Sequence, residues 1–105
     1  MELKEDTWVW VVVQDPGGNE VFLGQHDEVN DESFIPAFLE KQDALEGLEK
    51  LARDKDKEYE VQAIRYHLLT RYAEENGFLI FMLNSRGEIL NNPAAESEVA
   101  PHDNK

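Results

Sequence analysis

One polar stretch, residues 24–33, gathers the side-chain types that carry out acid–base or metal chemistry. It reads GQHDEVNDES and contains four acids, Asp27, Glu28, Asp31 and Glu32, with no Lys or Arg. Carboxylate oxygens bind hard divalent cations, but an EF-hand loop needs ligands at alternate positions, Gly at the sixth and Glu at the twelfth. The stretch lacks that spacing. We therefore expect a solvated acidic loop in place of a metal site.

The same stretch holds a Ser and a His that could form a nucleophile and base, Ser33 and His26. Nucleophilic catalysis needs both groups, and an orienting group, held by rigid elements. A single polar loop argues against such a fixed geometry. The chain also has no Cys, which excludes a thiolate nucleophile, a disulfide and a thiolate zinc site. We expect no catalytic residue, no cofactor and no metal.

The charge balance is strongly acidic, with 23 acids against 10 bases and a net charge of −13. Proteins hold phosphate backbones and anionic lipid surfaces with Lys and Arg, and affinity follows the number of phosphates neutralised. Nucleic acid and membrane are therefore not expected as partners. A protein partner or a homodimer is expected instead.

Length and composition favour one globular domain. A chain of 105 residues is in the range of a single domain, and 41 % hydrophobic and 10 % aromatic residues argue against disorder. The acidic residues 1–6 do not resemble a secretory signal, which begins with basic residues. The apolar run 8–13 is far shorter than the ~20 residues of a membrane helix. We expect a soluble, cytoplasmic protein.

The elements that must position these side chains alternate between strand and helix. Apolar patterning predicts strands at 8–13, 21–23, 34–38, 59–65, 78–83 and 88–90, and helices at 40–53 and 67–76. The order is β-β-β-α-β-α-β-β. Strand-helix-strand units form right-handed crossovers, so parallel pairs are expected among antiparallel hairpins. The predicted fold class is α+β, with one mixed sheet and two helices.

Three segments are expected along the chain. Residues 1–7 are predicted to be a flexible N-terminus, residues 8–90 the single α+β domain, and residues 91–105 a disordered acidic tail without apolar periodicity. Within the domain, Pro36 predicts an edge strand, or a strand in which the missing N–H points outward. Gly47 lies inside a helix at a cost of ~1 kcal/mol, either tolerated or needed for close packing.

Two tryptophans lie on one face of the first strand. Trp8 and Trp10 alternate with Val9, Val11 and Val13, so the two sets point to opposite faces. If helices cover only one face, one set is free for a partner. The unbroken apolar run equally fits a strand that is covered on both faces. The surface expected to meet a partner comprises Trp8, Trp10 and the four acids of residues 24–33.

Two stretches resemble a known family. FIPAF at 34–38, leading into a helix with Ala44 and Leu45, is similar to the "iPaFt-s-eea" stretch of the SseB-type N-terminal domain. NGFLIFMLN at 76–84 is similar to that family's "G-x-x-x-N-P" strand and turn. Leu39-Glu40 and Ser85 depart from the family's Thr-Ser and Pro. The resemblance, over residues 8–90, implies an α+β fold, no known catalytic residues and no functional site.

A full set of secondary structure without a catalytic constellation indicates a small, soluble, non-enzymatic domain. We expect it to bind a protein partner or itself. The alternative is a small metal-dependent or small-molecule enzyme that uses the acidic loop at residues 24–33. The two hypotheses differ in whether the four acids of that loop take part in catalysis or metal binding.

Overall fold

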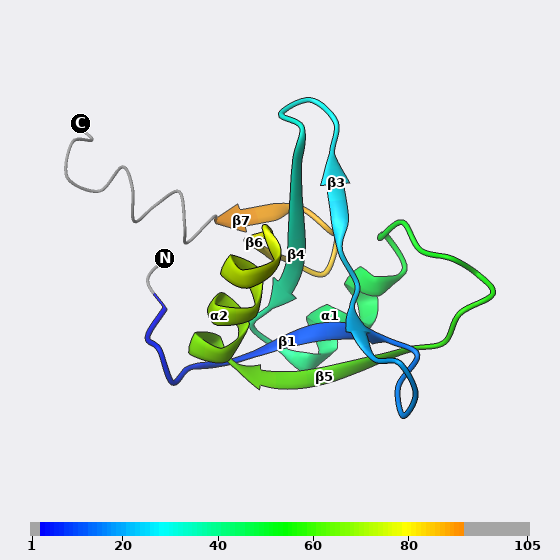
Figure 1. Cartoon of the computed structure of the whole chain (residues 1–105), viewed down its shortest axis with the longest axis horizontal. Helices are drawn as coiled ribbons and strands as arrows, with labels where there is room; N and C mark the ends of the chain where they lie inside the picture. Colours follow the sequence, from blue (N-terminus) through cyan, green and yellow to red (C-terminus); the bar gives the residue numbers. More distant parts are fainter. Residues whose placement is uncertain (1–2, 92–105) are drawn as a thin grey trace.

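A mixed sheet with one helix packed on each face makes up residues 3–91, the part of the chain that the computed structural model describes (Figure 1). The elements in chain order are β1 (Trp8–Gln14), β2 (Val21–Phe22), β3 (Gln25–Asp27), β4 (Glu32–Phe38), α1 (Lys41–Leu48), β5 (Tyr59–Arg65), α2 (Tyr66–Asn76), β6 (Leu79–Leu83) and β7 (Ile89–Asn91). This order confirms the predicted α+β class and adds one strand, β3, inside the stretch expected to be a loop.

Strand β1 has neighbours on both sides. It pairs with β5 over its whole length, and on its other side with β4 at Trp10–Val11 and with β2 at Val13–Gln14, always antiparallel. The only parallel pair among the described residues joins β4 to β6. The predicted mixture of parallel and antiparallel pairs is therefore confirmed, with β1 inserted between β4 and β5.

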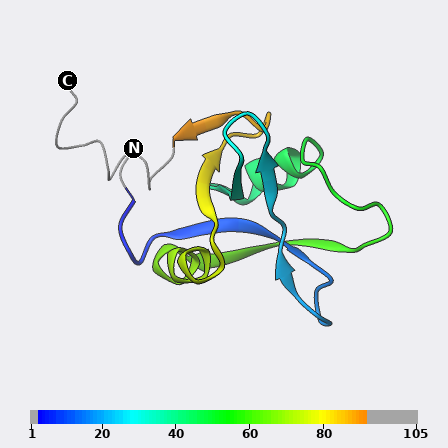
Figure 2. The same cartoon turned by 45° about the horizontal axis from the view of Figure 1, so that its top comes forward.

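Alternation along the strands divides the core into two clusters. The cluster on the α2 side contains Val9, Val11, Val13, Ile35, Ala37, Leu69, Ala73, Ile80 and Met82. The cluster on the α1 side contains Val12, Leu23, Phe38, Ala44, Leu51, Phe81 and Leu83. Because each face of β1 meets a helix layer, the strand is apolar at successive positions without polar alternation. Figure 2 shows α2 end-on beside β1 and β5.

The proline in β4 does not mark an edge strand, so the first of the two alternatives predicted for Pro36 is wrong. Strand β4 pairs with β6 from Phe34 to Ala37, and on its other side first with β3 and then with β1. The pairing with β3 ends at Phe34, and the pairing with β1 begins at Ala37. Pro36 lies in the gap between those two partners, where the ladder is interrupted and a residue without an N–H is accommodated.

Helix α1 ends at Leu48, five residues before the predicted end. The chain then tightens into turns in which Lys50 N–H donates to Gly47 and Leu51 N–H donates to Leu48. The Arg53 guanidinium also donates to the Leu48 carbonyl, at 2.6 Å, so this carbonyl at the helix end accepts two hydrogen bonds. Helix α2 ends as expected at Gly77, whose φ of 77° is the left-handed conformation that glycine favours.

The described residues before β1 make backbone hydrogen bonds to the start of α2, whereas residues 1–2 lie outside the described part, and the flexibility predicted for residues 1–7 stays a prediction. The Thr7 carbonyl accepts from Tyr66 N–H, and the Glu5 carbonyl accepts from His67 N–H, each at 2.8 Å. At the other end Asn91 belongs to β7, so the predicted tail begins no earlier than residue 92. Residues 92–105 lie outside the described part of the chain, and their disorder stays a prediction.

The described helices are short, and α2 is the longer at 11 residues. Within residues 3–91 no helix combines the length and the apolar character that crossing a bilayer requires.

Gly47 lies where α1 packs closely against Phe38 of the sheet. A Cβ at this position would lie 2.7 Å from Phe38 Cζ and 3.4 Å from the Asn84 carbonyl oxygen. Phe38 is completely buried, so its ring has little room to move.

We expect Gly47→Ala to destabilise the domain, although alanine is the better helix former by ~1 kcal/mol. Forcing a methyl group into this contact costs about 1–3 kcal/mol, and the propensity gain recovers only part of that cost. Thermal unfolding should show a lower melting temperature, by ~4–8 °C for each 1 kcal/mol of net loss. Gly18→Ala is the control, because its Cβ would meet only the Asp15 carbonyl oxygen at 3.6 Å. A higher melting temperature for Gly47→Ala would mean that Phe38 yields freely.

Candidate functional site

The acidic stretch is a β-hairpin, and its description as a flexible loop is wrong. Strands β3 and β4 pair at Gln25 with Phe34, at His26 with Ser33 and at Asp27 with Glu32. In Figure 1 this hairpin stands out from the rest of the sheet. Residues 28–31 make the turn, and Asp31 adopts a φ of 54°, a conformation that Asp tolerates better than most residues.

The side chain of Asp27 closes this turn. Its carboxylate accepts hydrogen bonds from the Val29 N–H at 3.0 Å and from the Asn30 side-chain amide at 2.9 Å. The Asn30 amide is the main reason that the pKa of Asp27 lies below its ordinary value, with further help from backbone N–H groups and His26. The carboxylate therefore already has a structural role. Glu28, Asp31 and Glu32 are exposed.

A polar cluster links the two arms of the hairpin. His26 Nδ1 lies 3.2 Å from Ser33 Oγ, and His26 Nε2 lies 3.1 Å from Asp31 Oδ1. These are the residue types of a hydrolase triad, in which the carboxylate is buried and orients the His. Here the Asp31 side chain is 94 % exposed and the His26 side chain 47 %. Water reaches all the charged atoms, so the cluster mainly ties the arms together.

A hollow of about 500 Å³ lies at the base of this hairpin. It is lined by Gly24, Gln25, His26, Glu28, Ser33, Ala52 and Phe78. The Gln25 side chain donates to the Ala52 carbonyl at 2.7 Å and accepts from the Ala52 N–H at 2.9 Å. These two hydrogen bonds hold the base of the hairpin against the segment that follows α1. Within residues 3–91, no three His, Asp or Glu side chains gather where they could hold a metal ion.

The two tryptophans differ in exposure. Trp10 is half-buried against the α1-side cluster, with Lys41 Nζ 5.7 Å from its ring centre. Trp8 is 52 % exposed, and the Arg65 guanidinium carbon lies 4.4 Å from its ring centre. Helices cover both faces of the sheet, as one of the two sequence-based readings anticipated. Trp8 nevertheless leaves half of its surface available for contact.

The six residues expected to meet a partner do not form one surface. Trp10 pairs with Phe38 at one end of β4, whereas Asp27 pairs with Glu32 at the other. Glu32 and Phe38 are six positions apart, which corresponds to roughly 20 Å along a strand. The tryptophans and the acidic hairpin are therefore separate features.

An open strand edge, which the sequence analysis did not single out, adjoins Trp8. Strand β5 has seven residues and pairs with β1 at every one of them. No other strand of residues 3–91 pairs with β5, which runs along the lower border of the molecule in Figure 1. The apolar alternation at residues 59–65 predicts a strand, but it carries no signal that the strand is at an edge. Only the pairing order reveals it.

Hydrogen bonds at both ends of the β1–β5 ladder fix which backbone groups face outward. Asp15 N–H donates to the Glu58 carbonyl, and Tyr66 N–H donates to the Thr7 carbonyl, each at 2.8 Å. In an antiparallel ladder, residue pairs alternate between hydrogen-bonded and non-hydrogen-bonded. The even-numbered residues of β5 therefore form backbone hydrogen bonds with β1. The N–H and C=O groups that point away from the sheet belong to Tyr59, Val61 and Ala63, and the N–H of Arg65 continues the row. The Arg65 carbonyl, at the N-cap of α2, already accepts the first hydrogen bond of that helix.

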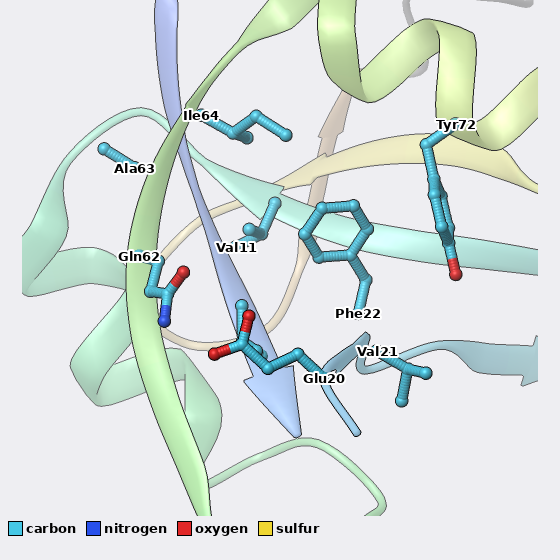
Figure 3. Close-up of a pocket in the computed structure, with 9 residues that line it drawn as sticks. Val11, Glu20, Val21, Phe22, Gln62, Ala63, Ile64 and Tyr72 are labelled. Carbon is cyan, nitrogen blue, oxygen red and sulfur yellow. The ribbon is translucent and has the colours of Figure 1, made fainter. Parts of the chain in front are cut away.

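An apolar groove of about 280 Å³ runs beside β5 on the α2 face. Its walls include Val11, Phe22, Ile64 and Tyr72, and the rings of Phe22 and Tyr72 meet edge to face at 4.7 Å. Figure 3 shows Ile64 on the groove side of β5 and Ala63 turned away from it. Side chains of even-numbered β5 residues therefore border the groove, and those of odd-numbered residues lie on the α1 face.

We expect Asn30→Ala to raise the pKa of Asp27 toward its ordinary value of 3.8, because the main hydrogen bond that stabilises the carboxylate is lost. In the native hairpin the lowered pKa stabilises the turn above pH 3.8, and this contribution disappears as the pH falls through the native pKa. Carbon-detected NMR titration of the side-chain carboxylates measures the shift. Glu88 is the internal control, because its pKa is lowered mainly by Asn84. An unchanged Asp27 pKa would show that backbone N–H groups suffice.

Comparison with known proteins identifies no relative. No protein-family model, curated protein or solved structure matches the chain. The resemblance of residues 8–90 to the SseB-type N-terminal domain therefore stays a prediction. Three features of the structure bear on function: the open edge of β5, the groove beside it and the acidic hairpin.

Proposed function

We propose that this protein is a small, non-enzymatic interaction domain that binds an extended protein segment by strand addition to the outer edge of β5. The observation that carries the proposal is the row of outward N–H and C=O groups at Tyr59, Val61 and Ala63, which the N–H of Arg65 continues. An open edge of this kind is a template for another strand. Main-chain hydrogen bonds supply affinity, and pockets for alternate side chains supply specificity.

Several properties make β5 a better docking edge than β7. Strand β5 pairs with β1 at seven consecutive positions without a register shift, whereas β7 has three residues and its pairing with β6 contains an irregularity. Proteins that protect an edge shorten it, or place Pro, a bulge or Lys on it. Charged side chains are a further protecting device, and β5 carries Glu60 and Arg65, but it has seven residues and no Pro, Lys or bulge. Its two charges, Glu60 and Arg65, cancel, although the whole chain carries −13.

Each face of an added strand would meet a different surface. Successive side chains of a strand point to opposite faces. On the α1 face they would lie beside Ala63 and Arg65, next to the half-exposed Trp8. On the α2 face they would lie beside Gln62 and Ile64, at the border of the apolar groove. Alternating apolar side chains in the partner would therefore find contacts on both faces.

We expect the backbone amides of β5 to exchange with solvent in an alternating pattern. In the unbound domain the amides of Val61 and Ala63 should exchange faster than those of Gln62 and Ile64, which bond to β1. A bound strand should protect Val61 and Ala63 selectively. Residue-resolved hydrogen exchange at low protein concentration, with and without captured partner, measures both effects. Uniform protection along β5 in the unbound domain would contradict an open edge.

Ala63→Pro removes one outward N–H without touching the hydrogen bonds to β1. We expect the variant to fold and to lose partner binding, because proline cannot donate to an added strand. Ala63→Val is the matched control, since it keeps the N–H and suits a strand. The wild-type chain, Ala63→Pro and Ala63→Val are each used as bait in a pull-down from an extract of the native host. Hydrogen exchange on the captured complex then shows whether the partner protects β5. Equal binding by the proline and valine variants would exclude this edge.

A second candidate function is an enzyme that uses the hairpin at residues 24–33, and one observation favours it. Ser33, His26 and Asp31 lie within hydrogen-bond distance in series, beside a hollow of about 500 Å³. The chemistry would be acyl transfer with Ser33 as nucleophile and His26 as base. The exposure of Asp31 counts against it, because a triad carboxylate is normally buried.

We expect the wild-type chain and Ser33→Ala to hydrolyse activated esters at the same slow background rate. The reason is that an exposed, solvated cluster offers little preorganised stabilisation of a transition state. Ester hydrolysis followed by absorbance, with His26→Ala as a further control, measures this. A rate that falls at least tenfold in Ser33→Ala would support the enzyme hypothesis over the interaction domain.

Two further predictions from the sequence accompany this proposal. One is a soluble protein in the cytoplasm, which fractionation of host cells with an antibody to the chain would test. The other is the relationship to the SseB-type N-terminal domain, which a comparison of this chain's strand order with that of a family member would test. Neither prediction enters the argument for β5.

A further inference from the structure

We infer that the segment that occupies the β5 edge is the β5 strand of a second copy of this chain. The two strands would run antiparallel around a two-fold axis at Gln62 and join two sheets into one. This inference rests on the proposed function, since it needs the edge to bind a strand. It adds the identity of the occupant and its register.

Alternate residues of β5 direct their backbone hydrogen-bonding groups outward, and self-pairing must bring these residues opposite one another. In a self-pairing centred on Gln62, Tyr59 lies opposite Arg65 of the second copy, and Val61 lies opposite Ala63 of the second copy. In this register the outward N–H and C=O groups of Val61 and Ala63 pair completely, and the Arg65 N–H meets the Tyr59 carbonyl of the second copy. The Arg65 carbonyl already accepts the first hydrogen bond of α2, so it meets the Tyr59 N–H of the second copy only through its second lone pair. Centring the pair one residue away, on Val61 or Ala63, also keeps the phase but leaves part of the seven-residue strand unpaired.

Charge supports the same register. Glu60 lies opposite Ile64 of the second copy, and Arg65 lies opposite Tyr59 of the second copy, so no like charges face each other. Like charges directly opposite would destabilise the pair. Centring on Val61 would instead place Arg65 opposite Lys57 of the second copy. The central register is therefore the one that uses the full strand and avoids repulsion at the seam.

Side chains on the α1 face form a continuous row across the axis. Val61 and Ala63 of each copy meet at the centre, and Arg65, already stacked on Trp8 at 4.4 Å, meets Tyr59 of the second copy. The row from Trp8 through Arg65 to Tyr59 combines cation–π contact with cross-strand pairing.

The net charge of −13 on each copy opposes association at long range. Salt screens such repulsion over ~8 Å at physiological ionic strength, so self-association should strengthen as salt is added. A basic peptide on the same edge would show the opposite response, because salt would weaken its attraction to the acidic domain. The sign of the salt dependence therefore separates a second copy from a basic partner.

Because the chain contains no Cys, a single introduced Cys can report the register of the pair through disulfide formation. A single Gln62→Cys places two thiols opposite each other on the axis, in a non-hydrogen-bonded pair with Cα atoms about 4.5 Å apart, which suits a disulfide. Glu60→Cys is the matched control on the same strand and face, because its symmetry mate is roughly 13 Å away. We expect rapid disulfide-linked dimers from Gln62→Cys under mild oxidation and at least tenfold slower linking from Glu60→Cys. Equal rates would overturn the register.

Sedimentation of the Cys-free full-length chain tests association independently. We expect a monomer–dimer equilibrium that shifts toward dimer between low and physiological salt, and a dissociation constant at least roughly tenfold higher for Ala63→Pro than for Ala63→Val. A chain that stays monomeric at every concentration and salt would overturn the second copy as occupant. If Ala63→Pro still abolished partner capture, the proposed function would survive that result. If it did not, both would fail.

Discussion

The structure depends on the burial of β1 between two helix layers and between strands on both of its sides. Val9, Val11 and Val13 face α2, and Val12 faces α1, so no face of the strand can turn to water. Its length is used in full by β5 on one side and divided between β4 and β2 on the other. A strand buried in this way sets the order of its neighbours, and it leaves β5 at the border because nothing further is needed to cover β1.

Much of the fold could be predicted because local patterns and global packing agree. Uninterrupted apolar residues at 8–13 predict a central strand, and Asn76 followed by Gly77 predicts the end of α2. The exceptions have tertiary causes. Pro36 lies inside the sheet because two strands, β3 and β1, meet β4 on either side of it. Helix α1 ends at Leu48, and the turns and the Arg53 guanidinium that satisfy its last carbonyls are contacts that periodicity does not encode.

The candidate sites were less predictable for a related reason. Composition locates the acids of residues 24–33 but not their hydrogen bonds, and Asp27 proves to hold a turn with Asn30. The pairing of His26 with Ser33 is a consequence of hairpin register, which a polar sequence specifies weakly. The open edge of β5 is invisible in its own residues, because an edge is defined by which strands are not beside it. Pairing order is a property of the whole chain.

The pairing of β1 with β5 also determines how the chain can fold. These strands are separated by β2, β3, β4 and α1, so their contact closes a loop of about 50 residues at a large entropic cost. Sheets built from such distant pairings form more slowly than helical bundles. The valines of β1 that face α2 gain their helix cover only after β5 is in place, because α2 follows β5 directly in the chain. A net charge of −13 opposes association of chains that still lack this cover.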